Sequence, residues 1–340
     1  MVYHKKTGEE NYLEHSVRID GRTRKISKYI GRGNFPDKQI EDEKKKYKDY
    51  FKTESFFIKF RERAKKYNLK FLDSREVGYL EFIKTAYNDW LKSIFPSETE
   101  KFEEIIYTKY VFNSTAIEGN TLTLEQTSLV LNENISPKGK SLREIHEVAN
   151  YKDLLNFISK YKGDINRKFI QNLNRYVLKN IKDECAGMYR NVPAMILGTE
   201  FTPLPPPFIE SEMNKLIRWY NDEKEKTYPL ELACIFHQKF EEIHPFSDGN
   251  GRVGRELFRF ILKKYKFPPL FFKVQDREEY LLALKEGNNA NHKPLMSLAI
   301  NSLKDDFKSL FINPEKEKEI KKIFNEKFGI KERQQTLSEY

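Results

Sequence analysis

A polar stretch, HPFSDGNGR (244–252), lies between two segments whose apolar residues follow helical spacing. The apolar positions are Leu230, Ala233, Phe236, Phe240 and Ile243 before it, and Val253, Leu257, Phe258, Ile261 and Leu262 after it. This pattern predicts two amphipathic helices, the first of them opened by Pro229. A plain connection between helices needs one glycine or asparagine, whereas this one holds many more polar and flexible residues. We therefore expect a loop with a chemical role that leads into a helix N-terminus.

The residue types of this loop suit a polyphosphate. A helix N-terminus has free backbone N–H groups and a partial positive charge, and Gly249 and Gly251 let the backbone approach an anion closely. Arg252 and Arg255 are three residues apart, so both project from one face of the helix and can hold phosphate oxygens. Together these features predict a cradle for phosphate groups.

Two further side chains add a metal ligand and a base. Asp248 supplies a hard carboxylate suited to Mg²⁺, and His244 can accept a proton near neutral pH. Each feature alone has an ordinary explanation, because histidines at helix ends are usually structural, Asp-Gly pairs are usually turns and spaced arginines usually face solvent. Their order within the segment 244–255 favours a nucleotide site instead.

The segment HPFSDGNGRVGR (244–255) resembles the Fic family signature without a departure, and AGMYRNVPAMILGTEFTPLPPP resembles the family's lead-in and flap. The resemblance covers residues 105–265. It implies a general base at His244, a buried anchor at Phe246, a Mg²⁺ ligand at Asp248, an anion loop of Gly249, Asn250 and Gly251, and phosphate contacts from Arg252 and Arg255. Members of this family mostly transfer AMP from ATP to a hydroxyl side chain of a target protein. The expected enzyme is therefore a nucleotidyltransferase, with ATP as co-substrate and Mg²⁺ as cofactor.

The segment VPAMILGTEFTPLPPP (192–207) interrupts the helical pattern. It predicts a short hairpin followed by a rigid, proline-rich arm. We expect the hairpin, with Val192, Ile196 and Thr199, to dock the target by pairing main chain with main chain. The alternative is a hairpin with a purely structural role.

A second motif, FNSTAIEGN (112–120), places Ser114 and Glu118 four residues apart, before Gly119. Alone it would be an ordinary helix end. Beside the loop at 244–255 it resembles the inhibitory motif of the Fic class with an N-terminal inhibitory helix, which implies that Glu118 pairs with Arg255, the arginine that holds the γ-phosphate. An exposed ion pair contributes only about 0–1 kcal/mol. Inhibition therefore needs a partly buried pair, or a carboxylate in the place of the phosphate.

The expected fold is mainly α, a Fic-type helical bundle with a β-hairpin flap and a small basic N-terminal β-hairpin. Residues 12–31 alternate around Asp20-Gly21, which predicts that N-terminal hairpin. Helical spacing covers 41–67, 75–94, 98–113, 141–160, 166–180, 209–222, 229–243, 252–265, 276–286 and 293–311. The predicted parts are the basic hairpin (1–35), a helical region with the inhibitory motif (36–140), the catalytic core (141–265) and a C-terminal helical region (266–340).

The net charge of +10 suggests either nucleic-acid contact or a lysine-rich surface with interspersed acids. A hydrophobic content of 39% allows a sizeable core. The two cysteines, Cys185 and Cys234, form no framework, which favours a reducing compartment. The N-terminus lacks the apolar core of a signal peptide, and no apolar run is long enough to span a membrane. We expect a cytoplasmic protein without a membrane partner.

Several functions remain open. The same site could also remove AMP, or transfer another phosphate-containing group as the Doc-like kinases and phosphocholine transferases do, although the intact Gly-Asn-Gly core favours adenylylation. A different class is a nucleic-acid-binding regulator that uses the basic hairpin. A zinc protease is excluded, because there is no HExxH motif. The expected partner is a protein that presents a tyrosine, serine or threonine, with self-modification and a homo-oligomer also open.

Overall fold

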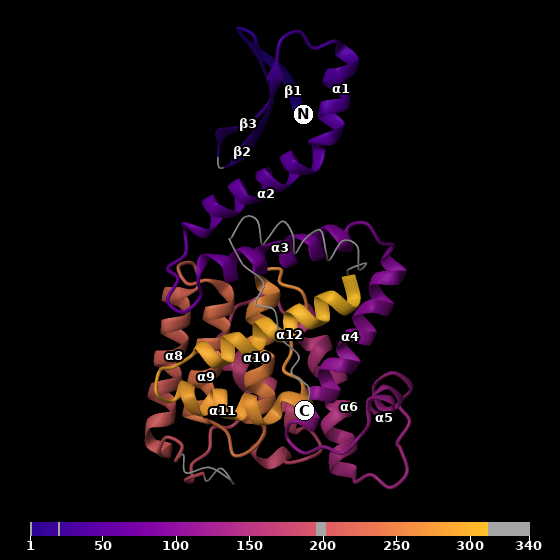
Figure 1. Cartoon of the computed structure of the whole chain (residues 1–340). Coiled ribbons are helices and arrows are strands. Elements are labelled where there is room, and N and C mark those ends of the chain that lie inside the picture. Colours follow the sequence, from indigo (N-terminus) through magenta and orange to yellow (C-terminus); the bar gives the residue numbers. More distant parts are fainter. Residues whose placement is uncertain (1, 20, 195–201, 312–340) are drawn as a thin grey trace, which may run out of the picture. The chain divides into compact units, whose positions relative to one another are not determined.

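The computed structural model describes residues 2–19, 21–194 and 202–311. The chain divides into two compact units, Met1–Asn68 with Asp73–Glu81 and Leu69–Leu72 with Phe82–Tyr340. Figure 1 shows the helices and strands of both.

The first unit contains an antiparallel sheet of β1 (Val2–Thr7), β2 (Glu10–Ile19) and β3 (Arg22–Arg32), in that order. The predicted hairpin is confirmed as β2 and β3, although Asp20 lies outside the described residues. A third strand, β1, pairs with β2 and was not predicted. The sequence VYHKKT of β1 has weak alternation, so its pattern did not indicate a strand.

Two helices, α1 (Asp37–Lys46) and α2 (Lys48–Ala64), follow the sheet. The core of this unit joins Leu13, Val17 and Ile26 of the sheet to Phe51 of α2. Apolar residues alternate with polar ones along these strands, so one face of the sheet is apolar. Helix α2 covers that face. The next helix, α3 (Ser74–Leu91), leads into the second unit.

The second unit is helical, as predicted. Its helices are α4 (Pro96–Ala116), α5 (Leu124–Ser128), α6 (Leu142–Lys160), α7 (Arg167–Leu178), α8 (Ile209–Glu223), α9 (Pro229–Ile243), α10 (Asn250–Lys264), α11 (Arg277–Gly287) and α12 (Lys293–Phe311). Short turns of other helix types cover Leu129–Glu133, Asp183–Cys185, Pro206–Phe208 and Val274–Asp276. Neither α5 nor these turns was predicted, because they are shorter than the stretch over which helical periodicity becomes visible.

Helices α9 and α10 lie at the centre of this unit and are buried along most of their length. Figure 1 shows both behind α11 and α12. The buried carboxylate of Glu231 in α9 accepts the backbone N–H groups of Lys70, Phe71 and Leu72 at 3.1, 2.9 and 2.7 Å. These hydrogen bonds stabilise the buried charge of the carboxylate, and the carboxylate in turn holds residues 70–72 in place.

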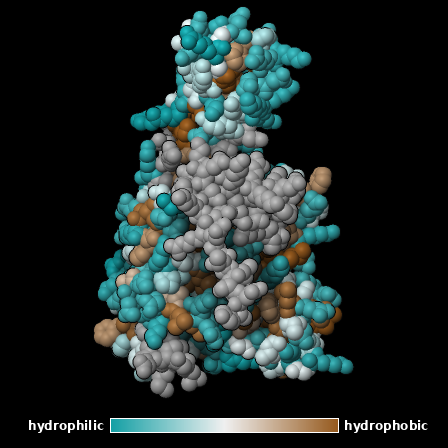
Figure 2. Space-filling view, in the orientation of Figure 1, coloured by the Kyte–Doolittle hydropathy of each residue, from teal (hydrophilic) through white to brown (hydrophobic). Residues whose placement is uncertain are grey.

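The described surface that Figure 2 shows is mostly hydrophilic. Among the described helices, none combines the length and apolarity needed to cross a membrane. Cys185 is half-buried and Cys234 is buried, and both are free thiols. Of the predicted flap residues, Val192 is exposed, whereas Ile196 and Thr199 lie outside the described residues.

Candidate active site

The loop between α9 and α10 begins with an unusual backbone conformation. His244 closes α9 with φ 49° and ψ 60°, a left-handed conformation that is uncommon for a residue other than glycine. Its N–H donates to the carbonyl of Phe240 at 3.0 Å, which ends the helix. Gly249 caps the start of α10 with φ 79°. A side chain there would meet Val177 at 2.9 Å, so only glycine fits both the conformation and the space.

The loop is closed by its own asparagine. The Asn250 side chain accepts the N–H of Phe246 at 2.9 Å and donates to the carbonyl of the same residue at 2.8 Å. Phe246 itself is fully buried, as expected of an anchor. Because the amide of Asn250 faces inward, this residue can reach a ligand only through its backbone N–H at the helix start.

Arg252 is the side chain that most directly fits an anion. It is buried, and its Nε and Nη1 atoms make no hydrogen bond with a described residue, although Nη1 lies 3.6 Å from Glu147 Oε1. Its Nη2 atom donates to Asp248 Oδ1 at 3.1 Å. Buried guanidinium N–H groups without partners are costly, and phosphate oxygens would satisfy them in a fork geometry.

Asp248 lies among three cations. Arg143 and Lys182 each approach its Oδ2 atom at 3.0 Å, while Arg252 binds the other oxygen. Burial alone would raise the pKa of Asp248, but Lys182, Arg252 and Arg143 hold that pKa below its usual value. The carboxylate is therefore ionised and can accept Mg²⁺ if Arg143 and Lys182 turn away. Mg²⁺ is often held by one or two carboxylates together with substrate phosphates, so this donor set fits.

The imidazole of His244 is neutral at physiological pH. Burial, together with the nearby charge of Arg190, lowers the pKa of His244 to about 4. Its Nδ1 atom is buried, which leaves Nε2 as the ring nitrogen that a hydroxyl group could reach. A neutral imidazole with an unused nitrogen is able to accept a proton from a hydroxyl group.

Arg190 is a site residue that sequence reasoning missed. Its Nε donates to the carbonyl of His244 at 2.7 Å, and its terminal nitrogens donate to the carbonyls of Val192 and Leu204 at 3.0 and 2.6 Å. Val192 is itself a predicted flap residue, at the start of the segment 192–207, and Leu204 lies in the proline-rich arm of the same segment. The arginine stood within the quoted segment AGMYRNVP, but nothing in the sequence indicated that one side chain binds both flap ends and the base.

The inhibitory motif reaches the same loop from α4. Arg255 donates through Nη2 to Glu118 Oε1 at 2.8 Å and to the carbonyl of Ser114 at 2.7 Å, and through Nε to Ser114 Oγ at 3.1 Å. The structure thus brings together the three residues that the sequence paired. The Arg255 side chain is 3% exposed and that of Glu118 is 41% exposed, so the pair is partly buried.

Glu118 also occupies the space above Gly251. A Cβ atom on Gly251 would lie 2.1 Å from Glu118 Oε1. The carboxylate therefore touches the first turn of α10, where a phosphate would bind. Burial favours the neutral acid, but the charge and hydrogen bond of Arg255 outweigh it and lower the pKa of Glu118. Glu118 is thus an anion beside the first turn of α10.

Several contacts hold the end of α4 in place. Asn120 donates to Glu147 Oε2 and to the carbonyl of Glu144, both at 3.0 Å. Arg277 donates to the carbonyl of Ile117 at 2.8 Å. Glu147 in turn accepts Arg143 at 3.2 Å, which connects the end of α4 to the cations around Asp248.

Three titratable groups lie behind Arg255. His237 and Tyr280 share a hydrogen bond of 2.8 Å, and His237 Nδ1 lies 3.9 Å from Glu241 Oε1. Burial raises the pKa of Glu241 to about 8 and lowers that of His237 to about 3. Both are therefore neutral at pH 7. They support the arginine without adding charge to the site.

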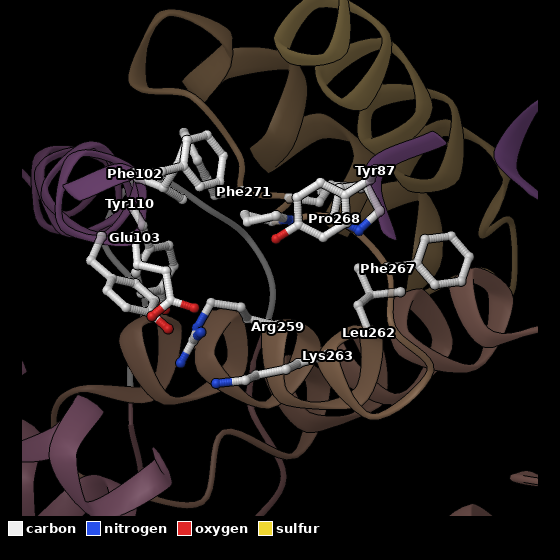
Figure 3. A pocket seen from close by; sticks show the side chains of 14 residues that line it. Tyr87, Phe102, Glu103, Tyr110, Arg259, Leu262, Lys263, Phe267, Pro268 and Phe271 are labelled. Carbon is white, nitrogen blue, oxygen red and sulfur yellow. The ribbon is translucent and has the colours of Figure 1, made fainter. Parts of the chain in front are cut away.

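A separate cavity of about 80 Å³ lies beside the C-terminal half of α10. Figure 3 shows Arg259 and Lys263 on one side of it and the rings of Tyr87, Phe102 and Phe271 on the other. Arg259 is already paired with the buried Glu256, through Nε and Oε1 at 2.9 Å. Binding pockets for small molecules usually have volumes of about 300–1,000 Å³, so this cavity is too small for a nucleotide.

Comparison with known proteins agrees with this geometry. The family model described as Fic/DOC family matches residues 164–262. A curated relative, the protein adenylyltransferase fic-1 of Caenorhabditis elegans, is 36% identical over 196 residues, which cover 56% of this chain and 38% of that protein. The relative from Nematostella vectensis, named protein adenylyltransferase Fic, is 32% identical over 56% of this chain and 45% of its own length. The chain thus spans less than half the length of these curated relatives.

Solved structures share the fold. The C. elegans Fic-1 fragment (aa134–508) superposes with a TM-score of 0.60 and 30% identity, over 68% of this chain and 69% of the fragment. A Fic domain containing signaling protein from Bacteroides thetaiotaomicron has a TM-score of 0.59 and 30% identity, over 66% of this chain and 96% of its own. From its loop, its helical core and these relatives, the chain belongs to the Fic/DOC family.

Proposed function

We propose that this chain is a protein adenylyltransferase that transfers AMP from ATP to a hydroxyl side chain of a target protein. The observation that carries the proposal is the buried Arg252, whose Nε and Nη1 groups make no hydrogen bond with a described residue and which lies in a helix-start loop beside Asp248 and His244. An anion cradle, a hard carboxylate and a neutral base then belong to one loop. The printed names of the relatives, protein adenylyltransferases, support the same reaction.

The chemistry follows from the residues. The hydroxyl oxygen of the target attacks the α-phosphorus of ATP, a new O–P bond forms, and the bond to pyrophosphate breaks. His244 accepts the hydroxyl proton on Nε2 of its neutral imidazole, a role that usually contributes about 10²–10⁴ in rate. Arg252, Arg255 and the N–H groups of the loop stabilise the charge on the phosphate oxygens.

Asp248 would hold Mg²⁺ together with the phosphates of ATP. When bound, the metal would neutralise phosphate charge in the transition state. Arg143 and Lys182 would then have to leave the Asp248 carboxylate. Both cations could bind phosphate oxygens of ATP instead.

The target would dock at the flap. Val192 is exposed, and with Ile196 and Thr199 it belongs to the segment that we propose to pair with the target's main chain. Arg190 supports this role, since it donates to the carbonyl of Val192 at the start of that segment, to that of Leu204 in the proline-rich arm, and to that of His244. The target hydroxyl would thereby be delivered to the base. Self-modification would use the same route, and the two free thiols fit a reducing compartment such as the cytoplasm.

Glu118 would inhibit the enzyme. Its carboxylate neutralises Arg255 and lies against Gly251, so it competes with the γ-phosphate for one arginine and one space. A surface pair would be too weak for this effect, whereas here the arginine is buried and the carboxylate excludes the ligand sterically.

Removal of AMP is a second candidate. Glu118 Oε1 is used by Arg255, and 41% of the side chain remains exposed. The second carboxylate oxygen can therefore hold a water molecule near the loop, which is what hydrolysis of an AMP-protein requires.

The test uses the full chain with Glu118→Gly, Mg²⁺ and ATP labelled at either the α or the γ phosphate. Adenylylation predicts protein labelling from α-labelled ATP alone, with the mass of AMP on a tyrosine, serine or threonine. Labelling from γ-labelled ATP would instead identify a kinase. Loss of label in the His244→Ala, Glu118→Gly double variant is the required control.

A further inference from the structure

The sheet of the first unit has one covered face and one face without a helix on it. Leu13, Val17 and Ile26 point toward Phe51 of α2. Residues paired across antiparallel strands lie on the same face, and successive residues alternate between faces. The face opposite α2 therefore carries Tyr12 paired with Tyr29, Ser16 with Lys25, Arg18 with Thr23, and Tyr3 and Lys5 from β1.

This outer face combines exposed aromatic rings with cations. Tyr29 is 49% exposed and Tyr3 is 39% exposed, and the ring of Tyr12 lies 5.5 Å from that of Tyr29. Arg18 and Lys25 are exposed, and neither has an ion pair with a described residue. These two cations are thus available to a partner, whereas Lys5 of the same face pairs with Glu14.

Two acidic residues, Glu10 and Glu14, lie on the outer face, and Glu10 accepts the hydroxyl of Tyr12. Glu14 is buried, and it accepts Lys5 at 3.1 Å and the hydroxyl of Tyr3 at 3.0 Å. Residues 1–35 contain eight lysines and arginines against four acidic residues. The field around this sheet therefore attracts a polyanion.

We propose that the outer face binds single-stranded nucleic acid. Bases would stack on Tyr29 and its neighbours, while Arg18 and Lys25 contact phosphates, a combination found in sequence-tolerant single-strand binding. The bases of a duplex are covered by their own neighbours, so exposed rings on a flat face are useful only to unpaired bases. An acidic protein would also use the cations, but it offers no regular series of planar bases for the rings to stack on.

The first test concerns stacking. The full chain is titrated with fluorescent oligo(dT) and oligo(U), with duplex DNA of the same length as comparison. Tyr29→Ala should weaken single-strand binding about tenfold, the lower part of the range for one stacked base, while Tyr29→Phe keeps the ring and should stay within about twofold. Circular dichroism of each variant checks the sheet.

The second test concerns charge and has a matched control on the opposite face. Arg22 and Arg24 pair in register with Ile19 and Val17, so they lie on the α2 side, and both are exposed. The double variant R18A/K25A should flatten the salt dependence of binding by about 0.7 in log–log slope for each phosphate that the protein no longer neutralises. The charge-matched R22A/R24A should leave that slope within error.

Three results would overturn the proposal: an equal fall in affinity in the two double variants, unchanged affinity of Tyr29→Ala, or duplex binding as tight as single-strand binding. Displacement of the oligonucleotide by polyglutamate at equal charge concentration would also reject it, in favour of an acidic protein partner. None of these outcomes depends on the proposed transferase activity, because His244 and Glu118 are unchanged throughout.

Discussion

Glu118 and Gly251 are in such close contact that the addition of one carbon atom to Gly251 would bring it within 2.1 Å of the carboxylate. The absence of a side chain at 251 leaves room for an anion at the start of α10, and Glu118 fills that room. A phosphate and this carboxylate therefore exclude one another, and activity should depend on which of the two is present.

Glu118→Gly should raise AMP transfer, including self-modification, by at least about tenfold. That change corresponds to about 1.4 kcal/mol. Arg255 would keep its bonds to Ser114, so its side chain stays in place while its charge becomes available. Incorporation of α-labelled ATP measures the effect, and Glu125→Gly, which removes an exposed acid from α5, is the control.

Arg255→Ala should not reproduce this gain, because it removes the phosphate contact together with the partner of Glu118. If Glu118→Gly is no more active than the unaltered chain, while both show His244-dependent labelling, Glu118 is an ordinary helix-end residue.

His244→Ala should abolish transfer and leave ATP affinity within a few-fold, because the base acts on the target's proton.

The lowered pKa of His244, about 4, also determines how activity depends on pH. The base must be neutral, so kcat/KM should rise with pH through about 4 and show no inflection from His244 between pH 5 and 8. An acid-side inflection near 6.5, the value of a free imidazole, would contradict the assigned environment.

Asp248→Ala should remove the tightening of ATP binding by Mg²⁺, measured by calorimetry with and without the metal. Lys182→Ala should have the opposite effect and lower the Mg²⁺ concentration needed, by up to about fivefold, because a partly exposed ion pair of about 0–1 kcal/mol no longer competes for the carboxylate. Lys179→Ala is the control, since Lys179 pairs with Asp153. Equal Mg²⁺ dependence in all three variants would rule out Asp248 as the ligand.

Arg190→Ala should lower kcat at least about tenfold with little change in ATP affinity, since Arg190 positions the backbone of His244 and does not face the phosphates. The melting temperature should also fall, because several buried carbonyls lose their donor. Arg167→Ala removes a nearby exposed arginine paired with Glu210 and should change neither quantity. A purely structural Arg190 would lower the melting temperature and leave kcat per folded molecule unchanged.

Helical spacing predicted most of the second unit, because buried faces such as that of α9 impose their period on the sequence. The roles of the loop residues could also be predicted, because these residues are consecutive in the sequence. The sequence did not predict the roles of Arg143, Lys182 and Arg190. These residues approach the loop only in the folded chain, and a single basic residue forms no sequence pattern. β1 was missed because a weakly alternating strand depends on its neighbour for pairing. The roles of Ile196 and Thr199 stay predictions.

The two hydrogen bonds between Asn250 and Phe246 have a consequence for binding kinetics. Ordering one residue of a mobile loop costs about 1–2 kcal/mol of conformational entropy. Here that ordering is completed during folding, so we expect a nucleotide to meet a rigid receptor and its association rate to depend on the departure of Glu118. Slow, saturable association that becomes diffusion-like once the carboxylate is removed would be the signature of such a gate.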